Sequence, residues 1–216
     1  MKRAHAAPLS NGVGLLVAES PTHCAAVQLW FPTTAGQRPG LAHLVEHLLV
    51  DQAQRFGPLS VGGHTSHDAI VLEVAAGPDD ALTALSQLAA AVTTAEISQQ
   101  QVEATRRVLA LERFSVESDP LWRAQEACAA ALFRGHPYGE SIGGSCDQIE
   151  GLSRAQVFDF LRRFVHAANA LVVVVGDVDR RPVAERAERV LGELAIGPPA
   201  HMPVPAVTGP VVLGPD

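Results

Sequence analysis

The sequence predicts an α+β domain in which a mixed or antiparallel sheet carries helices packed on one face. Three observations support this class. Short apolar runs bounded by Gly, Pro and Asn are typical of strands. Longer runs with apolar residues three and four positions apart are typical of amphipathic helices. The order of these runs is two strands, a helix, two strands, four helices, a strand and a helix, which is typical of helices gathered on one side of a sheet.

The N-terminal third of the chain contains most of the predicted sheet. Residues 13–19 follow an Asn-Gly turn and residues 24–31 follow a proline turn, and both runs predict strands. An almost wholly apolar helix is expected at 40–56. Residues 57–64 are rich in glycine, so a strand there would be narrow and have bare backbone. Residues 68–74 form the next clear strand.

Polar capping residues and apolar periodicity define the remaining elements. They are a helix capped by Asp79 with Leu82, Leu85, Leu88 and Val92 on one face, a helix from Ser98 to about Val116, a helix at 121–133, a helix from Ser153 to about Val165, a buried strand at 170–176 and a helix at 183–194. From residue 196 the chain is rich in Pro and Gly. We therefore expect one domain at 1–195 and a linker or docking tail at 196–216.

The composition of the chain limits the kinds of partner that it can bind and the cellular compartment in which we expect it. A net charge of -7, with no run of Lys or Arg, argues against a nucleic-acid or anionic-membrane surface. The three cysteines lack C-x-x-C spacing, which favours a reducing compartment over a disulfide framework. The apolar run behind the basic N-terminus is too short for a signal peptide, and no stretch is long enough to cross a membrane. The sequence therefore predicts a cytoplasmic protein.

The motif His43-Leu-Val-Glu46-His47 carries the clearest chemistry. Two imidazoles four residues apart share one face of a helix, which is the spacing that two ligands of one metal ion need, and Glu46 lies on the same side. The pattern H-x-x-E-H is the inverted zincin signature. The alternative is a helix with two core histidines and a solvated Glu. The apolar neighbours weaken that alternative, because an unpaired carboxylate in a buried helix costs several kcal/mol.

A catalytic zinc ion usually takes three protein ligands and leaves one position for water. The helix that begins at Ser98 offers Glu103 and Glu112, which lie nine residues apart and therefore on opposite faces. Glu112 follows the apolar run 108–111, whereas Glu103 lies among polar residues. These surroundings favour Glu112 as the third ligand.

At this point the chain resembles the inverted zincin metallopeptidases of the pitrilysin, insulin-degrading enzyme and mitochondrial processing peptidase family, as a single N-terminal-type half. Motifs in family order carry the resemblance, namely Leu9-Ser-Asn-Gly12, Gly40-Leu-Ala-His-Leu-Val-Glu-His47, Val108-Leu-Ala-Leu-Glu112, Asp119-Pro120, Phe133-Arg-Gly-His-Pro-Tyr-Gly139, Gly143-Gly144, and Asn169 leading into 172–177. The resemblance implies a processing-peptidase-like half-domain. It also implies a Zn²⁺ ion held by His43, His47 and Glu112, with Glu46 as the general base.

The family's activity implies a metalloendopeptidase that hydrolyses peptide bonds in short or extended peptides. Residues Gly62, Gly63, His64 and Thr65 fall where relatives have an edge strand that binds substrate backbone, and a plain glycine turn is the alternative. Family enzymes contain at least two homologous halves. We therefore expect a second homologous half as partner, in a heterodimer rather than a homodimer, unless this sequence is the N-terminal portion of a longer chain.

Two departures from the family pattern affect these expectations. The segment between Val50 and Thr65 is shorter than in relatives, and Thr105 stands where relatives often place a second Glu that supports the ligands. Two other functions stay open: a non-catalytic assembly or regulatory subunit of the same fold, and an amide hydrolase acting on a small biosynthetic intermediate. The complete set of ligands and base favours the peptidase.

Overall fold

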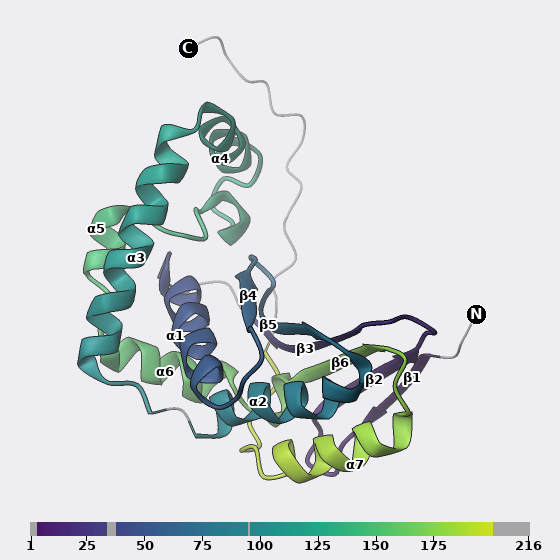
Figure 1. Cartoon of the computed structure of the whole chain (residues 1–216). Coiled ribbons are helices and arrows are strands. Elements are labelled where there is room, and N and C mark those ends of the chain that lie inside the picture. The colour runs from purple at the N-terminus through teal and green to yellow at the C-terminus, as the bar shows by residue number, and fades with distance from the viewer. Residues whose placement is uncertain (1–3, 34–37, 95, 201–216) are drawn as a thin grey trace.

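A computed structural model describes residues 4–33, 38–94 and 96–200, and its centre is a six-stranded sheet (Figure 1). The strand order is β1-β2-β6-β3-β5-β4. Only β2 and β6 pair in parallel, and the other pairs are antiparallel, so the sheet is mixed as predicted. The strands are β1 Ala4–Pro8, β2 Gly14–Glu19, β3 Ala25–Pro32, β4 Gly62–Thr65, β5 Ala69–Ala76 and β6 Leu171–Gly176.

Strand β6 joins two parts of the sheet that are far apart in sequence. It inserts between β2 and β3, where Val174 lies opposite Val17 on one side and Val27 on the other. Val172 and Val174 are buried, whereas Leu171 and Val175 are partly exposed on the opposite face. Only one face of β6 is therefore covered, as in an open sheet that has one face in water. The predicted buried strand is buried on that face alone.

Helices cover one face of the sheet, which confirms the predicted layers (Figure 1). In Figure 1, α2 and α7 lie below the sheet, α1 and α6 lie at its end, and α3 and α4 rise away from it. The helices are α1 Leu41–Arg55, α2 Ala81–Thr93, α3 Gln99–Ser118, α4 Pro120–Leu132, α5 Cys146–Glu150, α6 Arg154–Phe164 and α7 Arg180–Leu191. None of the helices in the described ranges is long and apolar enough to cross a bilayer.

Local sequence signals account for most element boundaries. Ser98 and Ser153 form complete capping boxes at the starts of α3 and α6, as their spacing to a Gln three residues later favours. The predicted cap at Asp79 is wrong, because Asp79 lies in a short 3-10 turn before α2. Strand β1 and helix α5 were not predicted. The residues of β1 are mostly exposed and do not alternate between apolar and polar, and α5 is too short to show the periodicity of apolar residues that is typical of a helix.

The described residues divide into two regions that differ in burial. Residues 110–143, which we call the arm, comprise the C-terminal part of α3, all of α4 and the loop that follows, and none of them is buried. We call the other described residues the body. The body contains the whole hydrophobic core, whereas the arm exposes Leu111, Phe114, Leu121, Trp122 and Leu132.

The predicted tail is only partly described. Residues 196–200 are included, and the backbone N–H of Ala200 donates to the side-chain oxygen of Asn169 over 2.7 Å. Residues 201–216 lie outside the described residues. The division at residue 195 stays a prediction.

Candidate metal centre

Helix α1 presents both histidines of the motif from within the body. Its apolar residues are buried nearly all round, and Gly40 precedes it with φ +82, where a Cβ would lie 2.8 Å from the carbonyl oxygen of Gly143. The half-buried rings of His43 and His47 emerge on one side with their Nε2 atoms 3.1 Å apart. The i, i+4 spacing therefore gives the convergence that the sequence predicted.

Glu112 approaches this pair from α3. Its Oε2 atom lies 3.6 Å from Nε2 of His43 and 3.5 Å from Nε2 of His47. One ligand atom from each of the three residues lies within 4.8 Å of the other two, so the structure brings the predicted donor set together.

The argument that selected Glu112 needs one correction. Glu112 was favoured because it follows the apolar run 108–111, but only Leu109 of that run is buried, and Val108 and Leu111 are exposed. Leu109 and Glu112 lie three residues apart and therefore share a face. Glu103, the alternative, instead accepts a hydrogen bond from Gln99 on the surface of α3.

The donor set fits a divalent cation of the zinc type. Two unprotonated imidazole nitrogens that face each other at 3.1 Å repel each other unless a proton or cation lies between them. Burial, followed by the proximity of His47, lowers the pKa of His43 to about 4, so His43 is a neutral imidazole near neutral pH and can offer an unprotonated ring nitrogen to a cation. Tetrahedral zinc with bonds of about 2.0 to 2.1 Å places its donors about 3.3 Å apart, close to the observed separations.

Glu46 lies beside the three donors without joining them. Its Oε2 atom is 3.9 Å from the Nε2 atoms of His43 and His47, and its side chain is buried. Burial, followed by the Glu112 carboxylate, raises the pKa of Glu46 to about 7, and the Thr65 hydroxyl opposes the rise. A carboxyl with that pKa can both accept and release a proton at neutral pH.

Strand β4 forms the other side of the site. Gly63, His64 and Thr65 line a cleft of about 470 Å³ together with His43, Glu46, His47 and Glu112, whereas Gly62 does not line it. The segment is a strand, so the alternative of a plain glycine turn is wrong. β4 is the last strand of the sheet, and no described strand pairs with its outer edge.

Gly63 has a role that we did not predict. A Cβ at this position would lie 2.3 Å from Oε1 of Glu46 and 2.7 Å from a methyl group of Val50. The missing side chain therefore leaves the space that the Glu46 carboxylate occupies. Gly62 is different, because a Cβ there would meet nothing nearer than 3.5 Å.

Sequence reasoning also missed a polar cluster next to Glu112. Arg113 forms ion pairs with Glu117 and with Glu126 of α4, and the hydroxyl of Ser141 donates to Glu126. Arg113 and Glu117 have the i, i+4 spacing of a helical ion pair, which is a usable signal. The contact of Arg113 with Glu126 depends on how α3 and α4 pack, for which the sequence offers no signal.

Two family models match the chain. Insulinase (Peptidase family M16) matches residues 15–145, and the Peptidase M16 inactive domain matches residues 151–216. An uncharacterised zinc protease of Rickettsia bellii is 24% identical over 208 residues, which cover 88% of this chain and 50% of that protein. A probable mitochondrial-processing peptidase subunit beta of Schizosaccharomyces pombe is 25% identical over 166 residues, covering 72% and 36%. An uncharacterised zinc protease of Mycobacterium tuberculosis is 31% identical over 181 residues, covering 73% and 39%.

Solved structures share the fold. A protease from Helicobacter pylori superposes with a TM-score of 0.84 at 20% identity, over 97% of this chain and 55% of that one. A chain of Complex III2 from Candida albicans gives a TM-score of 0.85 at 18% identity, over 95% and 50%. The chain spans half or less of the length of the three curated relatives described above.

Proposed function

This chain belongs to the insulinase family of peptidases, family M16, and from that premise we propose that it is the catalytic half of a zinc metalloendopeptidase. The observation that carries the proposal is the convergence of His43, His47 and Glu112, with the Glu46 carboxylate 3.9 Å from both histidine Nε2 atoms. A subunit that serves only as scaffold has no need for a buried Glu46 beside two half-buried histidines, because burial of a carboxylate opposes the apolar packing of α1.

Each residue of the site has a role in peptide hydrolysis. His43, His47 and Glu112 would hold the zinc ion, which, when bound, supplies a Lewis acid for the water and for the scissile carbonyl. Glu46 would accept a proton from the attacking water and then donate it to the leaving amine. The raised pKa of Glu46 suits the first step, because a carboxylate of ordinary pKa is a weaker base and would accept the proton from water less readily.

The edge of β4 supports an extended substrate. An unpaired strand edge presents backbone N–H and C=O groups to which a peptide can add as a further strand. Gly63, His64 and Thr65 place this edge beside the donor set, so a bound backbone would run past Glu46 and the metal ligands. Recognition through backbone groups requires little of the substrate sequence.

A second homologous half would complete the site. The arm carries Glu112 and lines part of the site, yet it contains no buried residue in 110–143 and exposes five large apolar side chains. A homologous half that packs over the arm would bury these side chains and close the cleft. We favour a heterodimer, because the chain resembles the zinc-binding half and a second copy would duplicate that half.

The test combines metal content with cleavage. We expect about one zinc per chain in the protein purified without added metal, and cleavage of unstructured peptides by the chain together with its second half. Glu46→Gln should keep the zinc and lower the rate of cleavage by about 10²-fold to 10⁴-fold. Glu103→Gln is the matched control on α3, and it should leave both readouts unchanged. Full cleavage by Glu46→Gln would remove Glu46 from the mechanism.

A non-catalytic subunit is the second candidate. The match of residues 151–216 to the M16 inactive domain favours it, as does the fold likeness to a Pseudomonas fluorescens M16 inactive domain, with a TM-score of 0.81 at 20% identity over 94% of this chain and 54% of that one. In that case the wild-type protein, with or without the second half, would cleave no peptide even when it contains zinc.

A further inference from the structure

A larger cavity continues from the metal centre into the arm. It has a volume of about 770 Å³, and three residues, His43, Thr65 and Glu112, line both this cavity and the cleft at β4. A substrate side chain next to the bond at the metal centre would therefore enter it. Leu109, Val116, Trp122, Ala130 and Ile142 give much of its wall an apolar surface.

Four carboxylates line the cavity, and Glu126 is the one on helix α4. Glu126 shares the cavity wall with Ala127, Ala129 and Ala130 of the same helix, and its side chain is one third exposed. A free carboxylate in such a cavity would attract the cationic side chains of Arg or Lys, because the surrounding apolar groups screen charge less than water does. Whether the cavity prefers a cationic or an uncharged substrate side chain therefore depends on which group neutralises the negative charge of Glu126.

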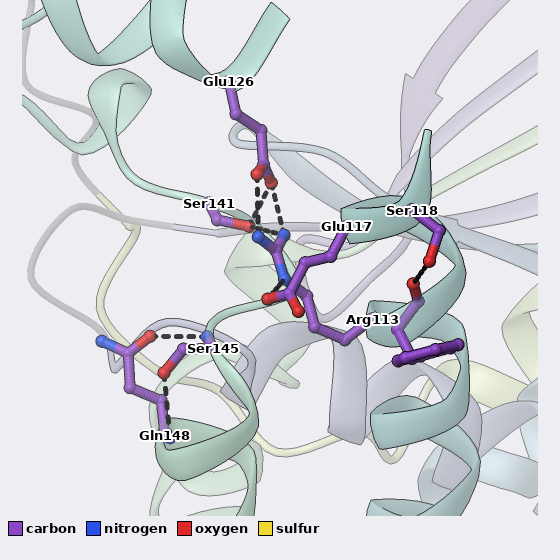
Figure 2. Close-up of polar contacts among 8 residues, drawn as sticks. Arg113, Glu117, Ser118, Glu126, Ser141, Ser145 and Gln148 are labelled. Atoms are coloured by element: carbon purple, nitrogen blue, oxygen red, sulfur yellow. Dashed lines mark hydrogen bonds and ion pairs between the residues drawn. The ribbon is translucent and has the colours of Figure 1, made fainter. Parts of the chain in front are cut away.

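Arg113 neutralises the charge of Glu126 through a bidentate ion pair. Its two terminal nitrogens donate to the two oxygens of Glu126, over 2.6 Å to Oε1 and 2.9 Å to Oε2 (Figure 2). The hydroxyl of Ser141 donates to the same Oε1 over 2.7 Å. Paired, planar contacts of this kind are the strongest form of the arginine-carboxylate interaction. The hydrogen bonds from Arg113 also lower the pKa of Glu126, so the carboxyl stays ionised and paired.

The other charged residues of the wall do not alter the neutralisation of Glu126 by Arg113. Glu117 accepts a hydrogen bond from Nε of Arg113 over 2.9 Å, and its nearly half-exposed carboxylate lies at the rim in water (Figure 2). Arg123 and Glu140 are exposed and have opposite charges. Glu112 also lines the cavity, but in the proposed function it is a ligand of the metal. Glu126 is thus the remaining carboxylate whose charge would reach a bound side chain most directly.

We propose that this cavity receives an uncharged apolar side chain of the substrate, and that Arg113 determines this specificity by compensating Glu126. The inference rests on the proposed function, because it takes a peptide as the ligand. Arg113 does not contact the reacting atoms in this scheme. It acts on the choice of substrate through Glu126.

The experiment measures binding, so that it does not depend on cleavage. The Glu46→Gln protein, loaded with zinc, is titrated into fluorescently labelled peptides that are identical except for one residue, which is Leu, Arg or Glu at each position in turn. Fluorescence anisotropy gives the affinities. At the position whose side chain enters the cavity, we expect the Leu peptide to bind at least about 10-fold more tightly than the Arg peptide, which corresponds to about 1.4 kcal/mol.

Four further variants in the same background test the role of Arg113. Arg113→Met keeps an unbranched apolar stem but removes the guanidinium and so frees Glu126, and the affinity ratio of Arg to Leu peptides should rise by at least about 10-fold. Adding Glu126→Gln should reverse that rise. Arg113→Lys should preserve most of the original preference, because it retains the charge. Glu126→Gln alone tests the proposal even if Arg113→Met unfolds, and it should tighten binding of the Glu peptide.

Several outcomes would overturn this inference. They are an unchanged ratio in Arg113→Met, a rise that persists after Glu126→Gln is added, and a failure of all the peptides to bind. Failure of the proposed function has a different signature. In that case the wild-type protein, together with its second half, cleaves none of the peptides, whereas the preference among them in binding is still measurable.

Discussion

The body and the arm contribute to one site by different physical means. The body fixes His43, Glu46 and His47 on a helix whose apolar residues, among them Leu44 and Leu48, are fully buried. The arm, residues 110–143, carries Glu112 without a single buried residue, and a polar cluster around Arg113 connects its two helices. The two histidine ligands are therefore positioned by the burial of α1, whereas Glu112 is positioned by contacts near the surface.

This comparison has a consequence for stability. Regions with few buried apolar contacts open at lower free energy than the core does. We therefore expect the arm to be the part of the chain that opens first, and ligand binding or a covering partner to stabilise it most. Three changes test this contrast, and they follow in order of expected effect.

Paired leucine substitutions give the largest expected effect. Leu48→Ala in the body removes a fully buried side chain and should lower the free energy of unfolding by about 2 to 5 kcal/mol. Leu111→Ala in the arm removes a side chain that is 70% exposed and should change it by no more than about 0.5 kcal/mol. Urea denaturation followed by circular dichroism, with a chelator present, measures both. A cost above 2 kcal/mol for Leu111→Ala would mean that the arm is covered in solution, which sedimentation would reveal as self-association.

Paired glycine substitutions test the part of the site that belongs to the body. Gly63→Ala places a methyl group where the Glu46 carboxylate lies, so it should displace the base and reduce cleavage by about 10²-fold. Gly62→Ala is the matched control on the same strand, and its methyl group fits in ordinary contact. Steady-state cleavage rates compare the two at equal zinc content. Equal activity of the two variants would contradict the role given to Gly63.

The pH dependence of the arm gives the smallest expected effect. Arg113 holds the pKa of Glu126 below its ordinary value of 4.5. A carboxyl with a lowered pKa in the folded state contributes stability that is present above pH 4.5 and is lost as the pH falls through the lowered value. Hydrogen exchange of the α4 amides, corrected for intrinsic rates, should therefore accelerate as the pH falls below 4.5. Glu126→Gln should remove this dependence, and a dependence that persists in that variant would assign it to another group.

Much of the fold could be predicted because its signals are local. The capping boxes at Ser98 and Ser153 and the turn before β2 depend on residues within a few positions of one another. β1 and α5 could not be predicted in the same way. β1 is a strand because its backbone pairs with β2, and its own side chains contribute little burial.

For the site, the sequence by itself determined the grouping of His43, Glu46 and His47, because the geometry of one helix turn fixes their spacing. It also limited the candidates for the third donor on α3 to Glu103 and Glu112, and favoured Glu112. Only the tertiary structure decided that Glu112 reaches the two imidazoles, that Gly63 leaves space for Glu46, and that Arg113 pairs with Glu126. These contacts join elements whose relative positions follow from the packing of the whole chain, which local spacing does not specify.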